Sequence, residues 1–187
     1  SNYKNGKWIS FKIGWMFGFG YFISSLYWVT NSLTFEENFK PLIPFALILI
    51  PLFLGGFYGI VTFACSFFSL NKKFSSILIF SIFFSLIEFI RGFILGGFPW
   101  NLIAFAWTDY LSILQILSFI GTYSFNLLSL TIFLIPAIIL FNYKIRIKLS
   151  FIVFATILLI TNFFYGSIII KNKEKLNEKN LNFVIKV

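Results

Sequence analysis

Long apolar tracts alternate with short polar segments along this chain. Crossing a bilayer takes about 20 mostly apolar residues in a helix. Five tracts are that long, and they cover residues 12–31, 42–70, 75–95, 111–141 and 149–170. The pattern therefore predicts an all-α, polytopic transmembrane helix bundle with about five spans.

Composition supports this prediction. Of the 187 residues, 59% are hydrophobic and only 11% are charged, whereas soluble domains average about 25% charged residues. So apolar a chain is not expected to be soluble or disordered. With 12 Gly, 5 Pro and a single Cys, it also does not fit collagen or a disulfide-stabilised scaffold.

The two ends of the chain suggest a piece of a longer protein. The chain begins with Ser rather than Met and lacks a secretory signal, so we expect it to be cut at the front. The polar stretch 171–180 is predicted to be a linker. Residues 181–187 then alternate like a β-strand, which predicts the start of a water-soluble domain. A frayed charged tail is the alternative.

Basic residues in short loops indicate how the chain is oriented, because Lys and Arg are retained on the cytoplasmic side. With five spans, one side has eight basic residues and no acidic one: Lys4, Lys7, Lys12, Lys72, Lys73, Lys144, Arg146 and Lys148. The short loops of the other side contain only Lys40 as a basic residue. The amino terminus is therefore predicted to be cytoplasmic and the carboxyl-terminal tail extracytoplasmic.

The tail reduces the difference in basic residues between the two sides, because residues 171–187 add five lysines to the second side. An alternative with six spans divides residues 99–141 in two and turns the tail inward. It would bury Asp109 in hydrocarbon, at roughly 2.5–3.5 kcal/mol. We therefore prefer five spans.

Glu88 and Arg91 form the one ionisable pair deep inside an apolar tract. Residues three apart are neighbours on one helical face, so the two can neutralise each other. A charge inside a membrane is by default a hypothesis of function. The equally weighted alternative is an ion pair that only locks this helix against its neighbours.

A segment that cannot continue the helix follows directly, with Gly96, Gly97 and Pro99. Trp100 lies where an interfacial aromatic residue is expected. The candidate site residues of this loop are Phe98, Pro99, Trp100 and Asn101. Such a loop could receive a lipid head group or support a docked domain, or it could be a simple connector.

Two pairs of glycines have the spacing that lets membrane helices approach closely. They are Gly14 with Gly18 and Gly55 with Gly59. We expect them to pack helices together.

The sequence lacks the residues that several kinds of catalysis and metal binding require. The chain has no His, which excludes His-based acid–base catalysis and His-ligated metals. Cys65 is expected to be an unreactive buried thiol, and neither a phosphate-binding glycine loop nor a carboxylate cluster is present. We therefore expect no catalytic residue, no metal and no cofactor. Cytoplasmic loops and the tail account for the net charge of +9, so nucleic-acid binding is not expected.

Three sequence blocks resemble the membrane region of the bacterial apolipoprotein N-acyltransferases in order and spacing. They are residues 14–29, which begin GWMFGFGYF and end LYWV, residues 88–92 (EFIRG) and residues 97–101 (GFPWN). The weaker block 121–128 (GTYSFNLL) fits the segment that follows.

The resemblance implies an inner-membrane enzyme with eight spans and an extracytoplasmic nitrilase-like domain before the last span. This family moves an acyl chain from a phospholipid to the amino group of a diacylglyceryl-modified lipoprotein, through a catalytic cysteine with a glutamate and a lysine. Two initial spans, that domain and the final span would lie outside this chain. Residues 181–187 resemble the domain's first strand.

Neither Glu88 nor Cys65 lies in a motif that matches the catalytic groups, so the fragment alone is expected to be inactive. The alternative to an acyltransferase is a segment of a transporter or channel, in which Glu88 and Arg91 would line a path. Transporters often contain internal repeats, and the two halves of this chain show no convincing repeat.

Overall fold

The computed structural model describes residues 2–68, 73–94, 97 and 99–180, and the described residues contain helices and no strand. The strand expected at 181–187 lies outside them. The chain divides into two compact units, one ending at Leu102 and one beginning at Ile103. Each unit is described by itself.

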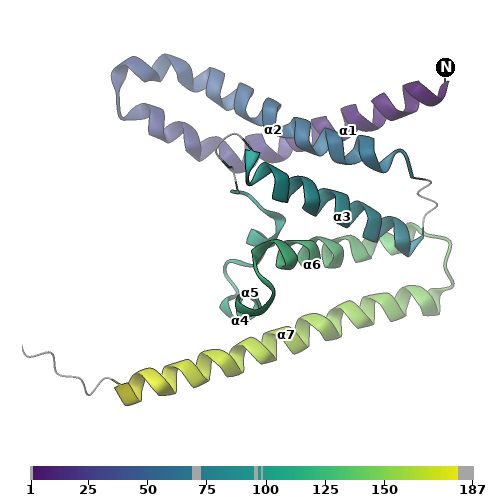
Figure 1. The fold of residues 1–187 in the computed structure, drawn as a ribbon, viewed down its shortest axis with the longest axis vertical. Helices are drawn as coiled ribbons and strands as arrows, with labels where there is room; N and C mark the ends of the chain where they lie inside the picture. Colours follow the sequence, from purple (N-terminus) through teal and green to yellow (C-terminus); the bar gives the residue numbers. More distant parts are fainter. Residues whose placement is uncertain (1, 69–72, 95–96, 98, 181–187) are drawn as a thin grey trace, which may run out of the picture. The chain divides into compact units, whose positions relative to one another are not determined.

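The first unit begins with a hairpin of two long helices. Helix α1 (Asn2–Leu26) continues into the 3-10 helices η1 (Tyr27–Thr34) and η2 (Glu37–Leu42), and α2 (Ile43–Cys65) returns alongside α1 (Figure 1). Two side chains join the helices. Trp15 donates from Nε1 to the Leu52 carbonyl over 2.8 Å, and Thr62 donates from Oγ1 to the Ser10 carbonyl over 2.7 Å.

Helix α3 (Phe74–Arg91) packs on α2 and completes this unit. The chain stops being helical soon after Arg91. Gly97 has a φ of +80°, and a Cβ there would come within 2.6 Å of the Gly92 carbonyl oxygen. Glycine is favoured at such a position because it has no Cβ. At Gly97 the chain therefore lies close to the end of α3.

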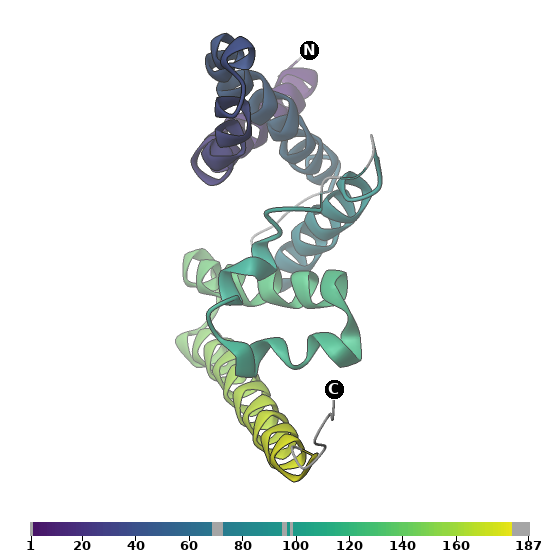
Figure 2. The same ribbon diagram turned by 90° about the vertical axis from the view of Figure 1, so that its left-hand side faces the viewer.

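The second unit contains η4 (Ile103–Trp107), α4 (Leu111–Leu114), α5 (Leu117–Ile120), α6 (Thr122–Leu134), η5 (Ile135–Leu140) and α7 (Ile145–Asn180). A small core of Ala104, Ile113 and Phe125 holds the short elements together. Figure 2 shows α7 as a single long helix. Asn162 on α7 donates from Nδ2 to the Ile113 carbonyl over 3.1 Å, which ties α7 to α4.

Four helices among the described residues are long and apolar enough to cross a membrane: Glu37–Cys65, Phe74–Arg91, Thr122–Leu140 and Ile145–Leu176. The described residues thus form an all-α, polytopic membrane-helix bundle, which confirms that part of the predicted fold class. The predicted start of a nitrilase-like domain lies outside them.

The helices differ from the expected tracts in three places. The first tract, 12–31, is α-helical only to Leu26 and is not among the four, because Lys12 and several Gly and Ser residues lower its mean hydropathy. The fourth tract, 111–141, is interrupted: Gly121, with a φ of +77°, separates the short helices from α6.

The third difference concerns the polar stretch 171–180, which was expected to be a linker. In the structure α7 continues through Asn180. This stretch contains no Gly or Pro and is rich in Lys and Glu, which have good helix propensity.

Candidate functional site

The predicted pair Glu88 and Arg91 lies at the carboxyl end of α3. The side chains are 0% and 1% exposed, and Arg91 Nη2 lies 3.7 Å from Glu88 Oε1. Because α3 is a regular helix, residues three apart share one face, and this face is turned inward. The pair is therefore an ion pair taken out of both water and lipid.

Tyr58 of α2 joins this pair, and the sequence interpretation missed it. Its hydroxyl donates to Glu88 Oε1 over 3.0 Å, and the residue is 1% exposed. The signal in the sequence is one hydroxyl among several in the apolar tract 42–70, which also contains Thr62, Ser66 and Ser69. The role of this hydroxyl can be recognised only once α2 is known to face Glu88.

Arg91 connects the buried pair to the loop after α3. Its Nη1 donates to the carbonyl of Trp100 over 3.0 Å, and its guanidinium carbon lies 5.1 Å from the ring centre of Phe22, in cation–π geometry. A charge-assisted hydrogen bond of this kind is about twice as strong as a neutral one. The predicted site residues Glu88, Arg91 and Trp100 are thus brought together.

Asn101 is held from the other side, by α1. Tyr21 donates from its hydroxyl to the Asn101 carbonyl over 3.0 Å, and Asn101 donates from Nδ2 to the Ser25 carbonyl over 3.2 Å. Asn101 has a φ of +59°, and Asn is among the few residues other than Gly that adopt this left-handed conformation readily. Hydrogen bonds from two helices therefore fix the loop.

The loop places Trp100 against Trp28 of η1. The two rings stack with centres 5.1 Å apart and planes 16° apart, and the residues are 49% and 41% exposed. Pro99 is exposed as well. Phe98, the remaining site residue predicted in this loop, lies outside the described residues.

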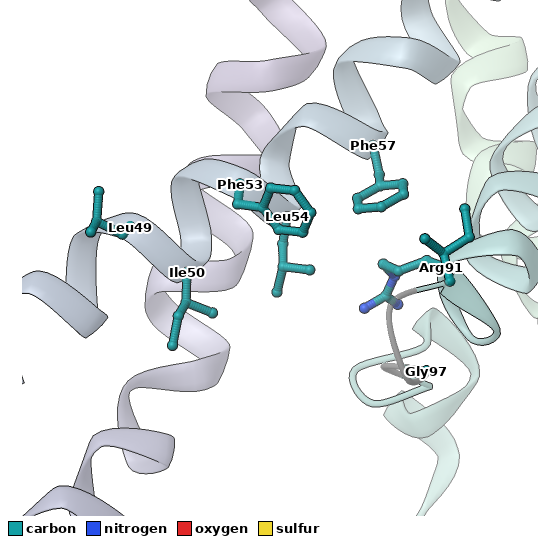
Figure 3. Close-up of a pocket in the computed structure, with 8 residues that line it drawn as sticks. Leu49, Ile50, Phe53, Leu54, Phe57, Arg91 and Gly97 are labelled. Atoms are coloured by element: carbon teal, nitrogen blue, oxygen red, sulfur yellow. The ribbon is translucent and has the colours of Figure 1, made fainter.

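An apolar cavity of about 440 Å³ opens beside the ion pair. One wall is a face of α2 and the other comprises the end of α3 and the loop (Figure 3). The lining residues are Leu49, Ile50, Phe53, Leu54, Phe57, Arg91, Ile94 and Gly97. The Arg91 guanidinium points from α3 toward α2 (Figure 3), so a hydrophobic wall faces one polar group.

The predicted packing glycines lie between α1 and α2. A Cβ at Gly18 would come within 2.8 Å of the Gly55 Cα, and a Cβ at Gly55 within 2.8 Å of the Phe19 nitrogen. A Cβ at Gly14 would collide with the Thr62 side chain, and one at Gly59 would lie 2.8 Å from the Phe11 ring.

Two further features of the described residues concern metal binding and thiol chemistry. These residues contain no group of three or more His, Cys, Asp or Glu that could hold a metal ion. Cys65 is a free, buried thiol. This part of the chain can instead hold an apolar molecule beside a fixed loop.

Most of this chain is similar to a known protein family. The family model described as "Apolipoprotein N-acyltransferase N-terminal domain" matches residues 3–135, which cover the buried pair, the loop and the glycines.

Relatives named apolipoprotein N-acyltransferase occur in several bacteria. That of Brucella melitensis is 33% identical over 76% of this chain and 27% of its own length. The relative from Sinorhizobium medicae is 35% identical over 68% of this chain and 24% of its own length. The relative from Rickettsia prowazekii is 38% identical over 66% of this chain and 25% of its own length. This chain thus spans about a quarter of these relatives. Since the family model covers well over half of the chain, the chain belongs to the apolipoprotein N-acyltransferase family.

Proposed function

We propose that this chain is the membrane portion of an enzyme that acylates lipoproteins. The acyl donor is a phospholipid, and the acceptor is the amino group of a diacylglyceryl-modified N-terminal cysteine. The match over residues 3–135 is the observation that supports this proposal most strongly. Relatives with that name are about four times longer than the part this chain matches, so the fragment alone is expected to be inactive.

The proposed reaction has two steps, as in other acyl transfers with a covalent intermediate. A cysteine thiol outside this chain gives its proton to a neighbouring base, and its sulfur attacks the carbonyl carbon of the phospholipid ester. The ester C–O bond breaks, and the lysophospholipid leaves after its oxygen takes that proton from the base. The lipoprotein amine then attacks the thioester. An amide forms, the amine gives up a proton, and the thiol is regenerated.

The cavity beside Arg91 suits one part of this task. Ligand pockets are typically about 300–1,000 Å³ and mostly apolar, with a few placed polar groups. A cavity of about 440 Å³ with an aliphatic and aromatic wall on α2 and a guanidinium at one side has this character. We propose that it holds one acyl chain of a lipid substrate.

The loop with Pro99, Trp100 and Asn101 is proposed to form part of the floor on which lipid esters and amines meet. Holding two reactants in a fixed geometry can supply a large share of a rate enhancement. Glu88 and Arg91 brace the helix beneath this floor. Phe98 is included in the proposal because of its place in the sequence.

The proposed location is the bacterial inner membrane, with the amino terminus in the cytoplasm and the tail outside. The distribution of basic residues in short loops supports this orientation. The tail should then react with a membrane-impermeant reagent in intact cells. Protection of the tail until the membrane is opened would contradict the orientation.

The full-length gene that contains this segment provides the test of the function. It is expressed in cells whose own apolipoprotein N-acyltransferase has been depleted, and lipoprotein amino termini are analysed by mass spectrometry. The proposal expects one additional amide-linked acyl chain per lipoprotein. Unacylated lipoproteins in cells that contain normal amounts of the inserted protein would contradict it, and further apolar spans in place of a soluble domain would favour a transporter.

A further inference from the structure

We infer that Tyr58 and Tyr21 are positioning residues, which act through Glu88, Arg91 and Asn101 to hold Trp100 stacked on Trp28. The structural part of this inference stands on the hydrogen bonds of the first unit. Its consequence for acyl transfer rests on the proposed function.

The first step is the fixed position of the Tyr58 hydroxyl. Four aromatic rings surround the phenol, and the nearest are Phe84, with its ring centre 4.4 Å away, and Phe22, at 5.1 Å. The residue is 1% exposed. With the ring held on α2, the hydroxyl meets Glu88 Oε1 on α3 at 3.0 Å. A movement of α2 against α3 is therefore transmitted to the carboxylate.

The second step passes from the carboxylate to the loop. Glu88 faces Arg91 at 3.7 Å, and Arg91 donates to the Trp100 carbonyl at 3.0 Å. A buried ion pair is not needed for stability alone, since well-packed apolar residues in its place often make a protein equally stable. A role in fixing one arrangement of the loop is a better reason.

The third step is a second attachment of the same loop, through Tyr21 of α1, whose ring centre lies 5.8 Å from that of Tyr58. Tyr21 donates to the carbonyl of Asn101, the residue next to Trp100, and the Asn101 amide donates to Ser25. Asn adopts the left-handed conformation of this position readily, and the two hydrogen bonds hold it there. The loop is therefore held from two directions, by α3 and by α1.

These contacts converge on one exposed feature. Trp28 and Trp100 are the stacked pair, and both are part-exposed. Tryptophan belongs at membrane–water interfaces, where its ring tolerates both phases. The positioning residues thus set the place of an aromatic surface beside the proposed lipid site.

The direct test uses this chain in lipid nanodiscs and the exciton-coupled circular dichroism of the stacked pair. Trp28→Phe gives the spectrum without the stack. Tyr58→Phe removes one hydroxyl and keeps the ring, and Tyr21→Phe does the same on α1. Each is expected to remove at least half of the coupling signal that Trp28→Phe removes. Tyr165→Phe, an exposed residue of α7, is the matched control and should leave the signal unchanged.

Several results would overturn the inference. An unchanged coupling signal in Tyr58→Phe or Tyr21→Phe would overturn it. This holds even if the melting temperature of the variant falls, because a hydroxyl that affects stability but not the stacking has a purely structural role. If Tyr58→Phe does not fold, the half-buried Tyr21 decides the question. An equal loss in Tyr165→Phe would show that the signal does not report on the loop.

A second arm uses the full-length enzyme. Misplacement of a substrate-binding floor by about 1 Å can lower activity on the order of 100-fold. Tyr58→Phe is expected to lower kcat/KM for acyl transfer by about 10-fold to 100-fold at an unchanged protein level. An unchanged kcat/KM would overturn the catalytic part. Absence of acyl transfer in the wild-type enzyme would instead contradict the proposed function and leave the spectroscopic result standing.

Discussion

At the scale of single residues, the first unit is organised around one buried carboxylate. Glu88 receives a hydrogen bond from Tyr58 and faces the charge of Arg91. Removing one member of a buried pair leaves the other charge uncompensated, at a cost of about 3–5 kcal/mol, whereas replacing both with apolar residues is often neutral. Stability and function should therefore respond differently to single and double substitutions.

We predict that Arg91→Leu destabilises the protein by about 3–5 kcal/mol, and that Glu88→Leu combined with Arg91→Leu restores most of this loss. Unfolding in detergent micelles measures both variants. The exposed pair Glu37 and Lys40, which lies in η2, is the control, and Lys40→Leu should change stability by less than about 1 kcal/mol.

In the full-length enzyme the variant with both Glu88→Leu and Arg91→Leu should remain unable to acylate lipoproteins. Normal acylation by a stable double variant would leave the pair no role beyond scaffolding.

Glu88 and Arg91 could be singled out from the sequence, because charges in an apolar tract are conspicuous. Tyr21 and Tyr58 could not, since tyrosines in apolar helices are unremarkable until their neighbours are known. The partner of Asn101, a backbone carbonyl at Ser25, is set by how α1 packs. Sequence periodicity does not contain that information.

At the scale of elements, α1 and α2 approach each other where side chains are missing. A Cβ at Gly18 or at Gly55 would come within 2.8 Å of a backbone atom of the opposite helix, and small residues of this kind allow membrane helices to pack closely. Gly20 and Gly56 lie on the same helices, yet a Cβ at either position would meet no atom within 4 Å. Gly20 and Gly56 can therefore serve as controls for substitutions at Gly18 and Gly55.

Gly18→Ala and Gly55→Ala are expected to destabilise the hairpin by about 1–3 kcal/mol, the usual cost of overpacking. Gly20→Ala and Gly56→Ala should be neutral or stabilising by about 0.5–1 kcal/mol, because Ala favours the helix. Unfolding in micelles distinguishes the two sets. Equal effects at all four positions would show that close contact at Gly18 and Gly55 is not what holds α1 on α2.

Element type was easier to predict than element ends. Tracts of 20 apolar residues in a membrane can hardly be anything but helices, so the helical class follows from hydropathy. The break at Gly121 depends on a backbone φ of +77°, which a glycine permits without requiring. The helical course of residues 171–180 depends on propensity and on continuity with α7, and a polar composition alone does not reveal it.

At the scale of the whole molecule, the chain corresponds to one part of its longer relatives. It matches the N-terminal domain of its family and about a quarter of the length of its relatives. The motifs at 14–29, 88–92 and 97–101 were sufficient to indicate this family from the sequence. Their physical meaning required the structure, which connects the first block with the third through Tyr21, Ser25 and Trp28. The first block meets the second where the Phe22 ring faces Arg91.

The central claim is that this segment serves as the membrane portion of a lipoprotein acyltransferase, and a chimera tests it most directly. Residues 3–135 replace the matching part of the Rickettsia prowazekii relative, which is 38% identical over 125 residues, and the chimera is the sole such enzyme in the cell. The mass of lipoprotein amino termini is measured. We predict an added amide-linked acyl chain, and its loss when the chimera carries Arg91→Leu together with Glu88→Leu. Lipoproteins that stay unacylated, although the chimera is folded and inserted at the level of the parent enzyme, would contradict the claim.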